Sequence, residues 1–221
     1  MSLPETLKKE WFIFPLLLAP FIASFILWDK LPEEVPIHFN FQGEADDWGP
    51  KWINAIMLPL IGVGIYVLLL VLPKIDPKKK ITSVQKPVSA IRIITSLFFV
   101  GIYAFVMAAS LGSSINFLSY ILVSVGVLIT IVGNYMNSMK PNYFIGVRTP
   151  WTLENPEVWK RTHRLTSKIW VITGIVMITL AFLPSILESA ITIIILITIL
   201  AVIPIVYSYL VFKKIDSVGV E

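Results

Sequence analysis

The stretch WINAIMLPLIGVGIYVLLLVL, residues 52–72, decides the class of fold. It carries no charged side chain, and a helix needs roughly 20 apolar residues to cross the hydrocarbon core of a bilayer. The whole chain agrees with this interpretation, because 56% of its 221 residues are hydrophobic, 14% are charged and the mean hydropathy is +0.81. An ordinary soluble domain is about a quarter charged. The few charges of this chain suit loops between membrane spans better than the surface of a globule.

Five further stretches are long and apolar enough to cross a membrane. The six predicted spans are residues 11–28, 52–72, 89–111, 117–136, 169–187 and 190–212. We expect the first span to be retained, because no small-residue cleavage site follows it at Trp28, Asp29 and Lys30. The sequence therefore predicts an all-α membrane protein built as a six-transmembrane-helix bundle. It contains no cysteine, which excludes disulfides, thiolate metal sites and a cysteine nucleophile.

The distribution of basic residues predicts the orientation of this bundle. Of the 18 lysines and arginines, only Lys30 and Lys51 lie in loops on the side away from the N-terminus. Cytoplasmic loops of membrane proteins carry the excess of Lys and Arg. We therefore expect a multi-pass membrane protein with both termini in the cytoplasm. The same asymmetry explains the basic pI without a nucleic-acid partner.

The loop over residues 29–51 is the most polar segment on the predicted extracytoplasmic side. We expect it to be structured, because VPIHFNF alternates as a short strand does and QGEADDWG provides turn residues at Gly43 and Gly49. Six carboxylates against two lysines make the loop acidic. The candidate ligand-binding residues of this loop are His38, Asn40, Gly43, Glu44, Asp46, Asp47 and Trp48.

The chemistry of this loop has several interpretations. His38 and a neighbouring carboxylate could hold a divalent metal, although there is no second imidazole or thiolate beside them. A general acid–base role for His38 lacks an accompanying nucleophile or oxyanion signature. In a purely structural role, His38 and Asn40 would hydrogen-bond to turn backbone. The last interpretation is an acidic, aromatic recognition surface that attracts a cationic amphipathic ligand.

The second informative region, residues 139–170, lies on the predicted cytoplasmic side. Its first part is rich in proline and glycine, and a helix is then predicted near residues 156–167, with Asn155 at the N-cap and Pro156 at the first position. Lys160, Arg164 and Lys168 share one face of this helix. Such a basic amphipathic helix is expected to lie along the anionic inner leaflet before the fifth span begins.

Two residues of this region invite a more specific interpretation. Arg148 lies in a rigid Gly-x-Arg-Thr-Pro setting, in which its guanidinium could bind loop carbonyls, a carboxylate or a phosphate. His163 is as compatible with a structural hydrogen bond as with a functional role. Its nearest titratable neighbours in sequence are cations, which would depress its pKa rather than make it a base.

Two motifs carry a resemblance to a known family. LPEEVPIHFNFQGEADDWGPKW, residues 31–52, resembles a small bacterial and archaeal membrane module with the pattern L-P-x-x-V/I-P-x-H-F/W-x-x-x-G-x-x-D-x-W/Y. KPNYFIGVRTPWTLENPEVWKRTHRLTSKIWVITG, residues 140–174, is similar to the core of the SdpI immunity family, with N-x-x-I/V-G-I/V-R-T-P followed by V-W-x-x-T-H. The two modules are typically fused in this order, which implies a two-span module over residues 1–88 and a four-span module over 89–221.

The resemblance implies a six-span plasma-membrane protein that protects a cell against a secreted, membrane-active toxic peptide. It also implies sequestration of a cytoplasmic transcriptional repressor at the membrane. The motif positions on the outer side are His38, Gly43 and Asp46. Those on the inner side are Asn142, Gly146, Arg148, Thr149, Pro150, Trp159, Thr162 and His163. The resemblance gives none of these residues a catalytic role.

The leading hypothesis is therefore a non-enzymatic immunity protein or receptor without a cofactor. The predicted spans lack the mid-membrane carboxylates or histidines of proteases and ion-coupled transporters, and Gly62, Gly64, Gly126 and Gly133 are interpreted as close helix contacts. A transporter of small molecules or lipids is an alternative, which flux into liposomes would reveal. A metal-dependent membrane enzyme built around His38 is another, which metal analysis of a His38→Ala variant would test.

Overall fold

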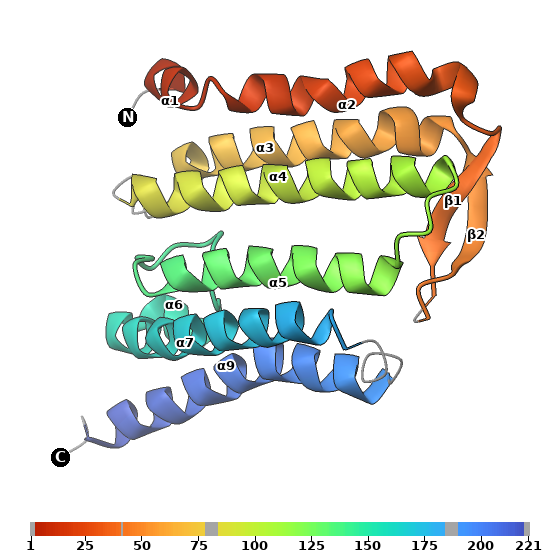
Figure 1. The fold of residues 1–221 in the computed structure, drawn as a ribbon. Helices are drawn as coiled ribbons and strands as arrows, with labels where there is room; N and C mark the ends of the chain where they lie inside the picture. Colours follow the sequence, from red (N-terminus) through yellow and green to blue (C-terminus); the bar gives the residue numbers. More distant parts are fainter. Residues whose placement is uncertain (1–2, 41, 78–83, 184–189, 219–221) are drawn as a thin grey trace.

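The computed structural model of this chain describes residues 3–40, 42–77, 84–183 and 190–218 (Figure 1). Most of these residues lie in long helices, and the described part of the chain also contains one β-hairpin. The helices are α1 (Leu3–Lys9), α2 (Ile13–Leu27), α3 (Leu58–Ile75), α4 (Gln85–Ser110), α5 (Phe117–Met136), α6 (Pro150–Glu154), α7 (Pro156–Leu180) and α9 (Ala190–Val218). The strands are β1 (Glu34–Phe39) and β2 (Ala45–Pro50), with a 3-10 turn over Trp28–Lys30 and a π-helical turn over Ile53–Met57.

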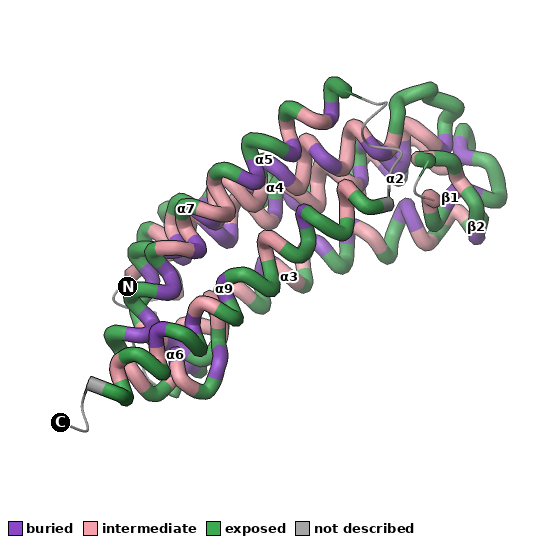
Figure 2. Tube along the Cα trace, turned by 90° about the horizontal axis from the view of Figure 1, so that it is seen from below, coloured by how far each residue is buried: buried purple, intermediate pink, exposed green. Residues whose placement is uncertain are grey.

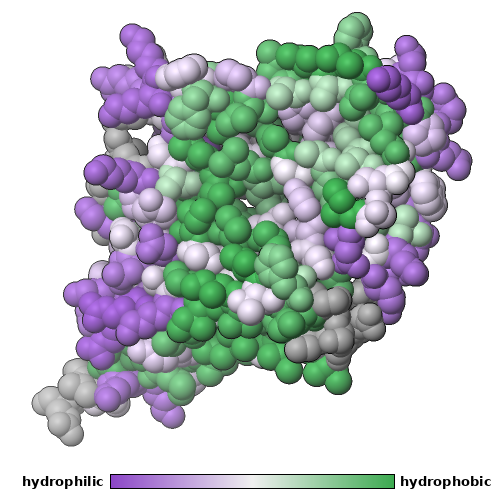
Figure 3. Space-filling model, viewed as in Figure 1, coloured by the Kyte–Doolittle hydropathy of each residue, from purple (hydrophilic) through white to green (hydrophobic). Residues whose placement is uncertain are grey.

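The long helices lie side by side and run between two ends of the molecule (Figure 1). The hairpin lies at one end, and α1 and the last turns of α9 lie at the other. A hydrophobic surface occupies the middle, between hydrophilic surfaces at the two ends (Figure 3). Figure 2 shows that the exposed residues follow the outer sides of the helices, whereas the buried ones turn inward. This is the surface expected of a protein that faces lipid, since large exposed apolar surfaces are rare on soluble monomers.

Five helical stretches in the described part of the chain are long and apolar enough to cross a membrane, judged by length and composition. They are Ile13–Lys30, Ile53–Ile75, Lys86–Ser110, Phe117–Met136 and Ile191–Ser217. The prediction of a helical, multi-pass membrane protein is confirmed at this level. The predicted span over residues 169–187 extends past residue 183 and so lies partly outside the described residues, and the number six stays a prediction.

One expected element differs in the structure. The basic segment near residues 156–167 was expected to be a separate helix on the membrane surface, but it is the first half of the continuous helix α7. Asn155 caps this helix as predicted, because its Oδ1 accepts hydrogen bonds from the N–H groups of Glu157 and Val158. The helix continues without a break after Lys168, where the side chains change from charged to apolar. Its first half already packs in the bundle, because Trp159 and His163 on one face are buried.

Glycines allow α5 and α7 to approach closely, which makes their contact the most extensive in the bundle. A Cβ at Gly126 would lie 2.7 Å from the carbonyl oxygen of Gly174, and one at Gly133 would lie 2.7 Å from the Cβ of Trp170. These distances confirm the predicted close helix contacts at Gly126 and Gly133. The same prediction is wrong for Gly64, because a Cβ there would meet no atom within 4 Å.

The loop over residues 29–51 is structured, as predicted, and its first part forms the predicted strand. β1 and β2 pair antiparallel, with Val35 opposite Gly49 and Pro36 opposite Trp48. The second strand was not expected, because its residues resemble a turn. The hairpin packs on the bundle through Phe39, whose ring stacks on that of Phe117 with their centroids 4.3 Å apart.

Candidate functional site

The β1–β2 hairpin brings two of the predicted ligand-binding residues into direct contact. Nδ1 of His38 lies 2.6 Å from Oδ1 of Asp46, and the two side chains are 66% and 42% exposed. The expected structural role of His38, a hydrogen bond to turn backbone, is therefore replaced by a bond to a carboxylate. This pair is open to solvent and offers an imidazole and a carboxylate to a ligand.

The other hairpin candidates divide into turn-forming and exposed residues. Asn40 shapes the turn, because its Oδ1 accepts hydrogen bonds from the N–H groups of Gln42 (2.9 Å) and Glu44 (3.0 Å). Gly43 has a φ of 82°, the left-handed conformation that favours glycine. The side chains of Glu44, Asp47 and Trp48 are exposed. Among the described residues, no three His, Cys, Asp or Glu side chains are grouped so that they could hold a metal ion.

At the opposite end, residues 138–155, which connect α5 to α7 and include the short helix α6, form a segment that we call the motif loop. Asn142 is fully buried at its centre. Its Nδ2 donates to the carbonyls of Lys140 (2.9 Å) and Ile145 (3.0 Å). Its Oδ1 accepts from the N–H groups of Phe144 (2.8 Å) and Ile145 (2.7 Å). One amide side chain thus replaces the regular backbone hydrogen bonds that the loop lacks.

His163 on α7 holds the next part of the motif loop. Its Nε2 accepts a hydrogen bond from the N–H of Val147 (3.1 Å), so its Nδ1 carries the proton and donates to the carbonyl of Trp159 (2.9 Å). Burial lowers the pKa of His163 to about 4, against the opposing effect of its bond to Trp159, so the ring is neutral near pH 7. Gly146 is required beside it, because a Cβ there would lie 2.2 Å from Nε2 of His163.

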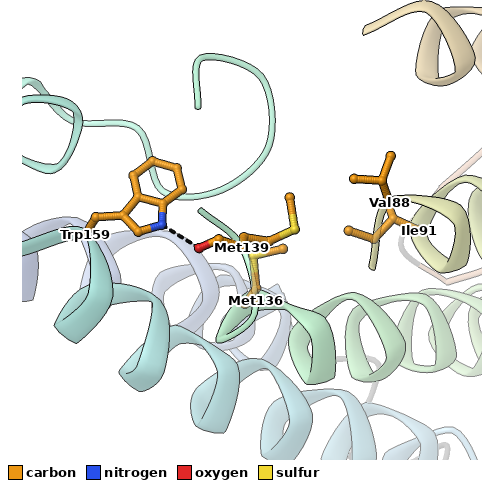
Figure 4. Packing of buried hydrophobic residues seen from close by; sticks show 5 residues of the cluster. All are labelled: Val88, Ile91, Met136, Met139 and Trp159. Carbon is orange, nitrogen blue, oxygen red and sulfur yellow. Dashed lines mark hydrogen bonds between the residues drawn. The ribbon is translucent and has the colours of Figure 1, made fainter. Parts of the chain in front are cut away.

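Trp159 anchors the same region to the core. Its indole stacks on the ring of His163 at 3.9 Å, and its Nε1 donates to the carbonyl of Met139 at 2.8 Å. Figure 4 shows this bond beside the buried side chains of Met136, Val88 and Ile91. The nearby Thr162 is fully buried, and its hydroxyl has no hydrogen-bond partner in the described part of the chain.

Thr149 and Trp151 connect the motif loop to α9. Thr149 and Thr152 form a capping box at the start of α6, in which Pro150 is the first residue. Ser208 on α9 accepts a hydrogen bond from Nε1 of Trp151 at 2.5 Å and lies 3.3 Å from the hydroxyl of Thr149. The capping bonds explain the threonine at this position of the motif, and the first position of a helix suits the proline that follows it.

Arg148 is the charged member of the motif, and it is exposed. One of its terminal nitrogens donates to the carbonyl of Tyr143 at 2.7 Å, which is one of the three kinds of partner expected from the sequence. His163, in contrast, is 1% exposed and cannot share an accessible face with Arg148.

A buried charged cluster near the same end was not predicted. Glu10, which follows α1, accepts hydrogen bonds from Arg92 on α4 (Nε to Oε2, 2.8 Å) and from the hydroxyl of Tyr66 on α3 (3.1 Å). Glu10 and Arg92 are each 3% exposed. The available signal was Arg92 itself, because a charge within a span needs a partner. The sequence did not identify Glu10, which lies 82 residues away.

Comparisons with known proteins agree with both motifs. Residues 138–208 match the SdpI/YfhL protein family, and residues 16–63 match a domain of unknown function (DUF1648). The immunity protein SdpI of Bacillus subtilis (strain 168) is 31% identical over 215 residues, which cover 96% of this chain and 99% of that protein. No solved structure matches this chain. Its apolar helices and these similarities make it a multi-pass membrane protein that belongs to the SdpI/YfhL protein family.

Proposed function

We propose that this chain is an immunity protein that binds or neutralises a membrane-active toxic peptide at the β1–β2 hairpin. The similarity to an immunity protein over nearly the whole chain supports the general role. The observation that carries the specific proposal is the exposed His38–Asp46 pair on an acidic hairpin. The proposed role requires binding and no catalytic step.

The hairpin has the surface chemistry that a cationic amphipathic peptide would recognise. Glu44, Asp46 and Asp47 present exposed carboxylates, while Trp48 and Ile37 present exposed apolar surface. Charge complementarity of this kind steers a cationic partner and fixes its orientation. The expected position of the hairpin on the extracytoplasmic side would place this surface where a secreted peptide arrives.

We further propose that peptide binding is relayed to a cytoplasmic repressor that docks at the motif loop. The contacts along α5 support this relay. Phe39 of the hairpin stacks on Phe117 in the first turn of α5, and Met136 in its last turn belongs to the core cluster of Trp159. A hairpin displacement could thus reach the motif loop through packed side chains. Arg148 would be the contact residue, and His163 would hold the neighbouring loop backbone in place.

Survival of a toxin-sensitive bacterium, challenged with the secreted toxic peptide of an SdpI-type system, tests the binding step. We expect wild type to protect and the double variant Glu44→Gln/Asp47→Asn to protect less. The control Glu154→Gln/Asp216→Asn removes two exposed carboxylates at the opposite end and should protect as wild type does. Equal protection by all three proteins at matched membrane expression would refute the hairpin as the binding site.

Recruitment of a fluorescent repressor to the membrane tests the second step. Arg148→Gln should reduce recruitment, because it removes the exposed guanidinium of the motif loop. Lys140→Gln, a charge change at another exposed position of the same loop, is the matched control. Unchanged recruitment by the Arg148 variant would exclude this residue as the contact while leaving the binding step untouched.

A further inference from the structure

A basic cavity of about 410 Å³ lies beside the first half of α7 and is closed on one side by α9. The residues that line it with charged or polar groups are Glu157, Lys160, Arg161, Arg164, Lys168 and Tyr207. It is separate from the motif-loop contacts, because Trp159 and His163 lie on the buried face of α7 and these side chains do not. Neither the hairpin nor the motif loop contributes to its lining.

The charges of this cavity are only partly neutralised by the protein. Nε of Arg161 donates to Glu157 at 2.7 Å. Lys160, Arg164 and Lys168 form no ion pair with any residue that the structure describes, and the hydroxyl of Tyr207 has no hydrogen bond there. The three cations are four residues apart on one helix face, where like charges repel and destabilise a helix. An anion bound among them would relieve this repulsion.

The cavity lies where the surface of α7 changes from charged to apolar. Figure 3 shows hydrophilic surface over the first turns of α7 beside the hydrophobic surface of the later turns. Ile172 and Ile175 follow Lys168 on the same face of α7, and Ile203 lies one turn from Tyr207 on α9; all three are exposed apolar side chains. A tyrosine such as Tyr207 is typical of headgroup depth. A ligand with a phosphate at the cavity would therefore have apolar surface beside it for acyl chains.

We propose that this cavity binds the phosphate of an anionic phospholipid headgroup. Lys160, Arg164 and Lys168 supply the positive charge, and the hydroxyl of Tyr207 supplies a further donor. Arg161 forms an ion pair with Glu157, which would orient its guanidinium toward the rim of the cavity. The acyl chains would lie on the exposed apolar surfaces of α7 and α9. This proposal stands independently of toxin or repressor binding.

Titration of the purified protein in mixed micelles, followed by native mass spectrometry, tests the proposal. The probes are phosphatidylglycerol, phosphatidylcholine and, as a soluble phosphate, sn-glycerol 3-phosphate. We expect wild type to bind phosphatidylglycerol in preference to phosphatidylcholine. The variant Arg164→Gln/Lys168→Gln should weaken phosphatidylglycerol binding about 30-fold, since each basic residue near an anionic lipid contributes about fivefold. Both positions are exposed, so the thermal unfolding of the variant should match that of wild type.

The control Lys213→Gln/Lys214→Gln removes the same charge from exposed positions of α9 that do not line the cavity. It should bind phosphatidylglycerol as wild type does. Equal weakening by both double variants would mean that surface charge alone attracts the lipid, and the proposal would be overturned. Undiminished binding by the cavity variant would overturn it as well. Competition by sn-glycerol 3-phosphate as strong as by the intact lipid would identify a soluble phosphate ligand instead.

Discussion

The two histidines of this chain occupy opposite environments. His38 at the tip region of the hairpin is 66% exposed and bonds to another exposed side chain, whereas His163 is 1% exposed and bonds only to backbone groups. His163 lies within the match to the SdpI/YfhL family, and His38 lies within the match to the domain of unknown function. The hairpin motif thus presents groups to the outside, and most of the motif loop holds its own backbone in place.

This difference indicates that the residues of a motif can serve either structure or ligand binding. Asn142 and His163 each bond to backbone groups of the motif loop, and Gly146 leaves room for the ring of His163, so the loss of either polar side chain leaves backbone groups unpaired. On the hairpin, the His38–Asp46 pair can be lost without leaving a buried group unpaired. We therefore expect variants of the motif loop to act on stability and variants of the hairpin pair to act on ligand binding.

Gly146→Ala should produce the largest loss of stability. Its φ of 122° is strained for any residue with a side chain, and the new Cβ would lie 2.2 Å from Nε2 of His163. Strain, overpacking and the lost bond to Val147 together cost about 3 kcal/mol or more. Thermal unfolding in detergent measures the effect. Gly64→Ala is the control, because a Cβ there meets no atom within 4 Å and alanine favours a helix; similar losses at both positions would contradict the prediction.

The pH dependence of stability should show the second largest effect. The pKa of His163 falls from 6.5 to about 4 on folding, chiefly because of burial, so the unfolded chain binds a proton more readily at this site. Stability from this site is therefore complete above pH 6.5 and is lost as the pH falls toward 4. By pH 5 the loss is about 2 kcal/mol.

Unfolding by denaturant at pH 7 and pH 5 measures this loss. His163→Gln provides the comparison, because it removes the titrating ring but keeps an amide that can bond to Val147. Its stability should be lower at pH 7 and should change less between the two pH values. An equal change in both proteins would mean that other groups cause the pH dependence.

The sequence predicted those features that depend on neighbours along the chain. Apolar length predicted five helices that could cross a membrane, the alternation around His38 predicted β1, and Asn155 followed by Pro156 predicted the start of α7. In each case the physical cause is local, because hydrogen bonding, side-chain alternation and capping act over a few residues. The predictions of close contacts at Gly126 and Gly133 also held, while Gly64 shows that a helical glycine alone does not determine which face is packed.

The features that sequence did not predict depend on distant partners. The residues of β2 have the composition of a turn, and they form a strand because they pair with β1. Glu10 has no distinguishing sequence context, and its role depends on Arg92 on α4. The environment of His163 was not predicted for the same reason, because it depends on residues that are distant in sequence. Its nearest neighbours in sequence are cations, but those cations lie on another face of α7, and burial rather than charge is the largest cause of its low pKa.

The hairpin pair should give the smallest change in stability. His38→Gln and Asp46→Asn each break an exposed interaction, and exposed pairs contribute about 0–1 kcal/mol. Thermal unfolding should therefore shift little, while protection against the toxic peptide should fall if the pair contacts it. Asn40→Ala separates the two effects, because it removes the acceptor that shapes the turn and should lower stability more than either change. A loss above about 2 kcal/mol for His38→Gln, which is typical of buried polar groups, would make this pair structural, and the contrast between the two histidines would then disappear.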